Sequence, residues 1–200
     1  MNTDLTQMPG YRVHDYLVVI NPPASMREKL DGIKQEFKNN YPGVPIINGA
    51  NLLLAKFSTW EMMEEKIVQR MKVIGMAAPS FKIQMKDYGS HPSHTIYINM
   101  ISILPVKELI RELKSIQRLM KSPAADPHFP DEQHFTISSR LNHGQYEKAW
   151  NEYAHRHFTG SFIADGMLLL KKVQGDKRYQ IVERFGFMNL PVGTKQGELF

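Results

Sequence analysis

Residues 133–140, with the sequence QHFTISSR, are the stretch around which the rest of this chain is organised. Successive side chains of a strand point to opposite faces, so a strand here places Phe135 and Ile137 on the core side. The other face then carries an imidazole, two hydroxyls and a guanidinium, from His134, Thr136, Ser138 and Arg140. These groups suit a phosphoryl ligand, although a polar strand face in water has the same pattern.

Length and composition indicate an ordinary globular protein. Two hundred residues are enough for one domain, or for two closely joined lobes, with a sizeable core. The chain has no cysteine, which excludes disulfide bonds, thiolate metal sites and cysteine nucleophiles. A formal net charge of +5 mildly favours a polyanionic partner, though such a charge is also common in proteins that never bind nucleic acid.

The distribution of apolar residues does not indicate a membrane protein. The first ten residues contain no apolar stretch that resembles a signal peptide, and no run of about 18 apolar residues occurs. We therefore expect a cytoplasmic protein that does not contact membranes, and we expect a monomer. The sequence has no glycine-rich phosphate loop and no complete set of metal ligands, so we predict no cofactor and no metal.

Hydrophobic periodicity and the proline and glycine breaks predict a similar order of elements in both halves of the chain. In the first half we expect strands at 16–20, 46–47, 52–57, 81–87 and 94–100, and helices capped by Ser25 and by Ser58 or Thr59. In the second half we expect a helix from Pro105, the His134 strand, a helix after the turn at 142–144, and a hairpin of 162–173 with 178–187. Gly175 and Asp176 form the predicted turn of that hairpin.

This order predicts an α+β fold with two similar lobes. Each lobe has an antiparallel-rich sheet with helices on its outer face, and the two sheets face a central groove. We expect a single bilobal domain over residues 1–200, with one lobe at about 12–103 and the other at about 104–188. Residues 189–200 are expected to form a loose tail.

The two halves correspond most closely at 51–57, NLLLAKF, and at 134–137, HFTI. In both places an apolar strand follows a loop and leads into a helix. This layout resembles the two-histidine phosphoesterase superfamily, which includes the bacterial 2′-5′ RNA ligases and cyclic phosphodiesterases. In that family each of two lobes contributes a strand motif, His-x-Thr or His-x-Ser, to a central cleft. The likeness extends over most of the chain, roughly from residue 16 to residue 187.

The resemblance implies roles for individual residues. His134 and Thr136 match the second motif, which implies an acid/base histidine and a hydroxyl that holds a phosphoryl oxygen. Asn51 stands where the first motif has histidine, and Leu53 where it has threonine or serine. An asparagine can form a hydrogen bond but cannot exchange a proton near pH 7, and losing one acid/base partner typically lowers a rate by about 10²–10⁴.

Two functions remain open on this basis. In the first, the protein binds, or slowly hydrolyses or ligates, 2′,3′-cyclic or 2′-5′ phosphoesters of RNA ends or nucleotides. The catalytic set is then His134, Thr136 and Asn51, with Asn51 as a hydrogen-bonding remnant. In the second, the protein is a non-catalytic module that binds a phosphorylated ligand or a partner. Whether the chain is an enzyme is left open by the altered first motif.

Further residues are candidates for substrate binding. Arg140 and Ser138 continue the His134 face, Tyr97 has a ring on which a base can stack, and Lys56 follows the altered first motif. The equally simple interpretations are a surface ion pair for Arg140 and a core or edge aromatic for Tyr97. Each of these residues is therefore a prediction for the structure to place.

Three histidines are candidates to replace the missing one, namely His14, His91 and His94. His14 precedes the first strand and is expected at the mouth of the groove. His91 and His94 lie at a hairpin bend, where a spacing of three in an extended chain directs them to opposite sides. As a metal site this pair lacks any nearby carboxylate except Asp87.

Overall fold

The computed structural model describes residues 10–47, 49–122, 125–173 and 176–191, which form two antiparallel sheets of four strands each. Sheet A has the order β2-β1-β7-β8, made of β1 (Val13–Ile20), β2 (Leu52–Trp60), β7 (Gly166–Lys172) and β8 (Gln180–Gly186). Sheet B has the order β5-β4-β3-β6, made of β3 (Phe81–His91), β4 (Thr95–Met100), β5 (His134–Ser138) and β6 (Thr159–Ala164). The α-helices are α1 (Ala24–Asn40), α2 (Glu64–Ala77), α3 (Ile103–Ser115) and α4 (His143–Tyr153), with short 3₁₀ helices η2 (Glu61–Met63) and η3 (Gln117–Met120).

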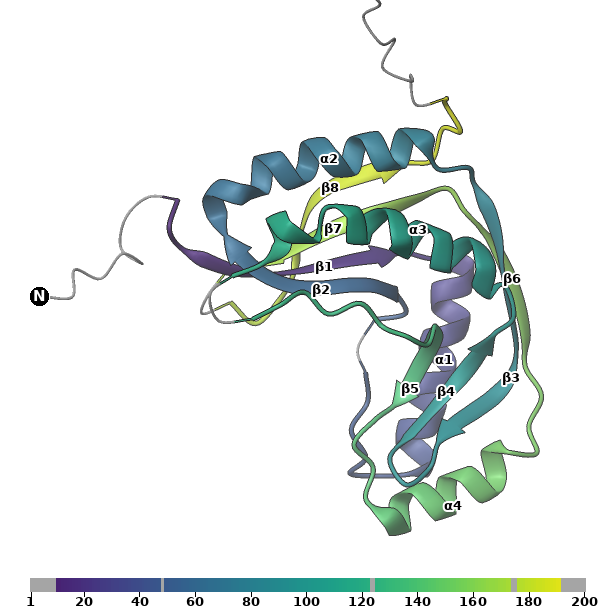
Figure 1. Ribbon diagram of the computed structural model, residues 1–200. Helices are drawn as coiled ribbons and strands as arrows, with labels where there is room; N and C mark the ends of the chain where they lie inside the picture. The colour runs from purple at the N-terminus through teal and green to yellow at the C-terminus, as the bar shows by residue number, and fades with distance from the viewer. Residues whose placement is uncertain (1–9, 48, 123–124, 174–175, 192–200) are drawn as a thin grey trace, which may run out of the picture.

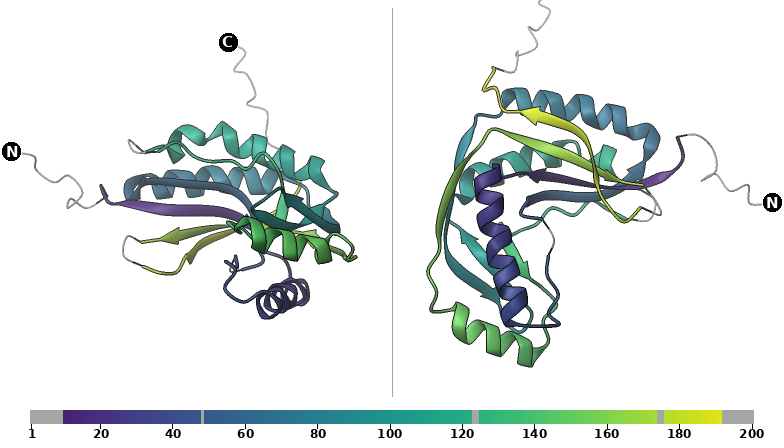
Figure 2. Two further views of the ribbon diagram at one scale, coloured as in Figure 1. Left: turned by 90° about the horizontal axis from the view of Figure 1, so that it is seen from below. Right: turned by 180° about the vertical axis from the view of Figure 1, so that it is seen from behind.

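The two sheets lie at a steep angle to one another, and each has its own pair of helices (Figure 1). Helices α2 and α3 contact sheet A, whereas α1 and α4 contact sheet B. Seen from behind, α1 lies over one face of sheet B (Figure 2). The predicted α+β fold of two antiparallel lobes with helices is therefore confirmed. In the described part of the chain, no helix has both the length and the apolar character that a membrane span needs.

The division of the strands between the two sheets does not follow the two halves of the chain. Sheet A contains β1 and β2 from the first half and β7 and β8 from the end, and the four strands between them form sheet B. The predicted lobe boundary at 103/104 therefore does not coincide with the division between the sheets. The predicted strand 162–173 is also wrong as one element, because it divides at Asp165 into β6 of sheet B and β7 of sheet A.

Two predicted helix caps are wrong. The first helix begins at Ala24, with Pro23 rather than Ser25 at the N-cap. Ser58 and Thr59 lie inside β2, because the pairing of β2 with β1 continues to Trp60. The hydroxyl groups that suggest caps serve tertiary contacts instead: Ser58 donates to the Asp15 carboxylate, and Thr59 faces the carbonyl oxygens of Leu119 and Lys121.

The predicted hairpin at the end of the chain is present as β7 and β8. Its turn residue Gly175 lies outside the described residues, as do residues 192–200 of the predicted tail. The start of that tail is bonded to the rest of the protein, because the backbone N–H groups of Asn189 and Leu190 donate to the carbonyls of Ala78 and Met76.

The main hydrophobic core runs through both lobes as one cluster that includes Tyr16 of sheet A, Phe37 of α1 and Ile96 of sheet B. A small second cluster lies apart from it. It consists of Val19, Leu168 and Leu170, with Leu17, Leu53 and Tyr179 packed against them. These residues alternate along β1 and β7 with residues of the main core, so they belong to the opposite face of sheet A.

Thr59 offers a test of how β2 is joined to the segment after α3. Its side chain is fully buried, with Oγ1 3.2 Å from the Leu119 oxygen and 3.1 Å from the Lys121 oxygen. We expect Thr59→Val, which keeps the shape and removes the donor, to lower the free energy of unfolding by about 1–3 kcal/mol in urea titrations. Thr59→Ser keeps the hydroxyl and serves as the matched control. Equal stability of the Val and Ser variants would contradict this assignment.

Candidate functional site

His134 begins β5, and the register of β5 with β4 decides which side chains accompany it. His134 pairs with Asn99 and Thr136 with Tyr97, after which a bulge shifts the register. Phe135 is buried in the main core, while His134 and Thr136 are half-buried on the other face. His134 and Thr136, the side chains of the second motif, therefore lie on the face that the alternation predicts.

Beyond the bulge, the predicted polar face is wrong. Ser138 is fully buried and donates its hydroxyl hydrogen to the Pro45 carbonyl, so this hydroxyl is already engaged within the protein. Arg140 lies outside β5, is exposed, and has a left-handed backbone with a φ of 59°. A bulge breaks the simple alternation of side chains, and the sequence pattern does not reveal its position.

The Tyr97 ring stacks on the His134 imidazole, with 4.1 Å between the ring centroids and 24° between the planes. Gly89 lies opposite Tyr97 in the neighbouring strand β3. A Cβ atom at Gly89 would lie 2.5 Å from both the Tyr97 ring and the Asn99 side-chain oxygen. The absence of a side chain at Gly89 thus makes room for the ring that supports His134.

Burial lowers the pKa of His134 to about 4, with a smaller contribution from nearby His91, while Glu132 acts in the opposite direction. The imidazole is therefore neutral at pH 7. A neutral imidazole can accept a proton or bind a cation, but it cannot donate a proton as an imidazolium does. Burial also raises the pKa of Tyr97, and the negative charge of Glu132 adds to that effect.

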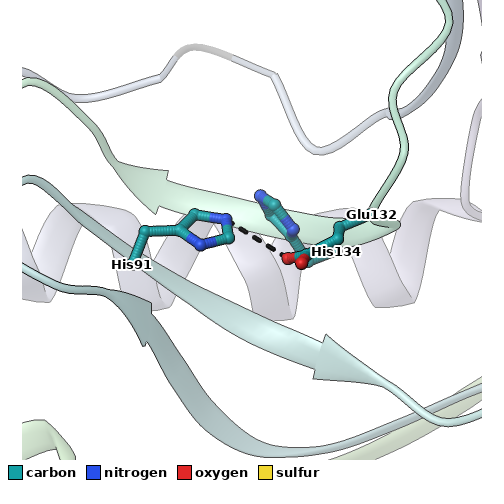
Figure 3. Close-up of side chains that lie close together, drawn as sticks. All are labelled: His91, Glu132 and His134. Atoms are coloured by element: carbon teal, nitrogen blue, oxygen red, sulfur yellow. Dashed lines mark ion pairs between the residues drawn. The ribbon is translucent and has the colours of Figure 1, made fainter.

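His134 lies beside two residues that the sequence did not place in its site. His91 ends β3 and directs its ring toward the Glu132 carboxylate, with 3.6 Å between Nε2 and Oε2 (Figure 3). The His91 and His134 rings are 5.2 Å apart between centroids. One ligating atom from each of His91, Glu132 and His134 lies within 4.8 Å of the other two. From the sequence, His91 was a candidate replacement histidine and, with His94, a metal site short of carboxylates. Glu132 was not a candidate, although it precedes His134 by two positions.

The first motif position has a different environment. Asn51 is exposed and immediately precedes β2. Leu53 is half-buried and packs against the small apolar cluster of Val19, Leu168 and Leu170. The wall that carries a hydroxyl in the family pattern is therefore apolar in this protein.

Two backbone bridges relate the two motif positions. Lys56 of β2 pairs antiparallel with His128, and Ile46 pairs antiparallel with Ser138 of β5. Ten positions separate Ile46 from Lys56, and ten separate His128 from Ser138. Asn51 and His134 therefore lie near the middle of two antiparallel stretches that are joined at both ends.

Buried Lys34 of α1 holds the loop before Asn51. Its ammonium group donates to the carbonyl oxygens of Ile47 and Gly49, and the side chain is only 5% exposed. Burial lowers the pKa of Lys34 to about 8. With the Ser138 bond to Pro45, this fixes both ends of the segment that leads to the first motif position.

The remaining candidates have varied surroundings. His14 is buried in β1 beside Glu61, so the expected position at the mouth of a groove is wrong. His94 has its Nδ1 2.6 Å from the Thr95 hydroxyl and its ring stacked on His91. Asp87 is bonded to the Phe158 backbone N–H and to His157, away from His91. Lys56 has an exposed side chain.

A pocket of about 270 Å³ adjoins His134. It is lined by Tyr97, Asn99, Met100, Ile103, Lys107, Asp131, Glu132, Gln133 and His134. A larger pocket of about 420 Å³ lies beside α2 and α3 and includes none of the motif residues, so its size does not make it the candidate site.

Gly89→Ala tests whether the Tyr97 ring needs the space over β3. We expect the added methyl group to displace Tyr97 or Asn99, to lower the free energy of unfolding by about 1–3 kcal/mol, and to alter the His134 ring environment in NMR spectra. Gly32→Ala is the control, because a Cβ atom added there, on the exposed face of α1, would have no atom within 4 Å. Unchanged NMR signals of His134 in Gly89→Ala would contradict this packing role.

Lys34 should affect how stability depends on pH. Its pKa falls from 10.5 to about 8 on folding, so between these pH values the unfolded chain binds more protons than the folded one. The free energy of unfolding should therefore gain a contribution that rises from pH 8 to pH 10.5 and is constant below pH 8. Denaturation across this range should show that Lys34→Met removes the contribution, whereas exposed Lys38→Met retains it. The same pH slope in wild type and Lys34→Met would refute the shift.

No protein-family model and no curated protein sequence matches this chain. Several solved structures are similar to it. E. coli LigT complexed with 3′-AMP matches with a TM-score of 0.63 and 17% identity, covering 88% of this chain and 99% of LigT. TT0787 of Thermus thermophilus matches with a TM-score of 0.63 and 14% identity, covering 87% and 98% of the two chains. A phosphoesterase matches with a TM-score of 0.60 and 16% identity, covering 87% and 98%.

Solved structures of E. coli LigT also include complexes with phosphate, NADP+ and ATP. At these sequence identities the similarity concerns the fold. The resemblance inferred from the sequence motifs is confirmed at that level: the chain has the fold of the two-histidine phosphoesterases.

Proposed function

We propose that the face around His134 and Thr136 binds the phosphoryl group of an RNA end or a nucleotide that carries a 2′,3′-cyclic or 2′-5′ phosphoester. The protein would hydrolyse or ligate this bond slowly. The observation that carries the proposal is the position of His134 and Thr136 on one half-buried face, with Asn51 on the opposed antiparallel stretch. A monomeric cytoplasmic protein is part of the proposal.

The lining of the pocket includes the acidic Asp131 and Glu132, but other groups around it can contact an anionic ligand. Lys107 contributes a cation to the lining, and His134 contributes a neutral imidazole. Exposed Lys56 and Arg140 are further proposed contacts for a phosphate chain. Tyr97 remains a proposed stacking partner for a base, although one face of its ring already lies against His134. Ser138 is not included, because its hydroxyl is bonded to the Pro45 carbonyl.

The ligands of similar proteins add to this support. E. coli LigT has been solved with 3′-AMP, with ATP and with NADP+, all of which carry phosphate on a nucleoside. A ligand of that class offers phosphoryl oxygens to Thr136 and a base to an aromatic ring. We therefore extend nucleotide binding to this chain as a proposal.

The chemistry proposed for His134 is proton acceptance. A neutral imidazole can take the proton of an attacking water or ribose hydroxyl. Asn51 can hydrogen-bond to the departing ribose oxygen but cannot protonate it. One of the two proton transfers is thus unassisted, which is why the proposed reaction is slow.

The alternative is a non-catalytic module that binds a phosphorylated ligand. The packing of Leu53 favours it, because a leucine side chain at this position cannot hold a second phosphoryl oxygen. Binding and catalysis make different demands, since binding needs only the His134 face. The two functions are therefore separable by restoring the first motif.

Adenosine 2′,3′-cyclic phosphate is the substrate for this test, with the product measured by chromatography in the presence of EDTA. We expect slow turnover by the wild type and a loss of about 10²–10⁴ in His134→Ala, because the proton acceptor is removed. The double variant Asn51→His/Leu53→Thr rebuilds the first motif and should gain a factor of similar size. His143→Ala, at an exposed histidine of α4, should act like the wild type.

Calorimetric binding of 3′-AMP separates the two functions. A folded double variant that binds 3′-AMP but remains inactive would favour the binding module. If neither the wild type nor the double variant binds 3′-AMP or turns over the cyclic phosphate, the proposed function is wrong. Circular dichroism of each variant establishes that it is folded.

A further inference from the structure

We propose that His91, Glu132 and His134 form a binding site for a divalent transition-metal ion. The site was not expected from the sequence, which predicts no metal. It rests on the convergence of two imidazoles and one carboxylate from two separate places in the chain, the end of β3 and the start of β5. Among the described residues, no other group of three potential ligands lies so close together.

The spacing of the three side chains is close to that of a metal site. Zinc–ligand bonds of about 2.1 Å place tetrahedral ligands about 3.4 Å apart. His91 Nε2 and Glu132 Oε2 are already 3.6 Å apart, and all three ligating atoms lie within 4.8 Å of one another. Figure 3 shows the two rings and the carboxylate directed into one shared space. An ion would have to draw the three ligating atoms together by at most about 1.4 Å, from 4.8 Å to about 3.4 Å.

The chemical nature of the ligands restricts the choice of metal. Two imidazole nitrogens and one carboxylate oxygen suit Zn²⁺, Co²⁺ and related ions, whereas Mg²⁺ prefers oxygen ligands alone. Three protein ligands leave at least one coordination position open. The site adjoins the pocket of about 270 Å³ that Glu132 and His134 both line.

The surrounding strands hold the site in a defined geometry. His91 ends β3 and His134 begins β5, and the strand between them, β4, supplies the Tyr97 ring. This ring lies 4.1 Å from His134 and 4.9 Å from His91 between centroids. Both imidazoles therefore pack on one aromatic side chain, which reduces the conformational freedom that they lose when an ion binds.

Other histidines beside carboxylates supply comparisons. His143 lies 3.1 Å from Glu147, and His157 lies 3.2 Å from Asp87. Each of these pairs joins one imidazole to one carboxylate on the surface, without the second imidazole that distinguishes the His134 cluster. They are suitable controls for weak binding of metal ions at exposed side chains.

A consequence for phosphoester chemistry rests on the function proposed above. A metal ion at this place can bind a phosphoryl oxygen through its open position. It would then supply, on the His134 side, the positive charge that Asn51 cannot provide. In the metal-bound protein His134 is a ligand, and it no longer serves as a proton acceptor.

Isothermal titration of the untagged protein, freed of metal by EDTA and then dialysed, tests the site directly without any nucleotide. We expect Zn²⁺ to bind with a stoichiometry of one and Mg²⁺ to give no saturable signal. Co²⁺ should produce visible absorption bands of a coordinated ion. Absence of saturable Zn²⁺ and Co²⁺ binding would overturn the proposal, and His91 with Glu132 would then be a surface ion pair only.

Variants identify the ligands. Glu132→Gln and His91→Ala should each weaken Zn²⁺ binding by at least about 10-fold, since changes even beyond the direct ligands have effects of this size. His143→Ala should bind Zn²⁺ as the wild type does. Loss of binding in His143→Ala, or unchanged binding in both ligand variants, would place the ion elsewhere and refute the site. Glu132 is exposed, so Glu132→Gln is expected to fold normally, as circular dichroism can verify.

The outcome is independent of the proposed function. Zn²⁺ binding with no hydrolysis and no 3′-AMP binding would support the metal site and contradict the phosphoester function. Turnover in EDTA that depends on His134, combined with no Zn²⁺ binding, would do the reverse. The two proposals can therefore fail separately.

Discussion

The pairing of two sheet edges with distant backbone is the constraint on which the arrangement of the site depends. Strands β2 and β5 are edge strands of sheets A and B, so each presents backbone groups that need partners. The segment before β5 pairs with β2 at His128, and the loop before β2 pairs with β5 at Ile46. The backbone that leads into β5 thus pairs with the edge of β2, and the backbone that leads into β2 pairs with the edge of β5. This reciprocal backbone pairing places the two motif positions on opposed antiparallel stretches, regardless of the side chains at these positions.

The two motif positions carry different kinds of side chain within this shared backbone frame. On sheet B, His134 and Thr136 have polar side chains, and the Tyr97 ring, for which Gly89 leaves room, stacks on His134. On sheet A, Leu53 has joined an apolar cluster of aliphatic side chains. Because backbone pairing does not depend on side-chain identity, the fold tolerates this change. The result is one polar and one apolar wall, and the proposed contacts with a phosphoryl group therefore come from the sheet B side.

The polar wall is richer than a single motif. His91 and Glu132 accompany His134, and burial keeps the His134 imidazole neutral. A neutral imidazole is suited both to accepting a proton and to binding a cation, and these two roles exclude one another at any one moment. The site is therefore organised around the His134 imidazole. The groups that contact this imidazole decide whether it accepts a proton or binds a cation. Lys34 holds the loop that ends at Asn51 by donating to the carbonyl oxygens of Ile47 and Gly49.

By itself, the sequence determined the alternation of β5 as far as Thr136, the residue types at Asn51 and Leu53, and the α+β class. These follow from local periodicity and residue type, which a single strand or helix expresses without its neighbours. Only the tertiary structure decided that a bulge turns Ser138 inward and that the chain crosses from sheet B to sheet A at Asp165. It also decided that His91 and Glu132 lie beside His134. Such features depend on the register between strands that are far apart in sequence, and the pattern within one segment does not determine that register by itself.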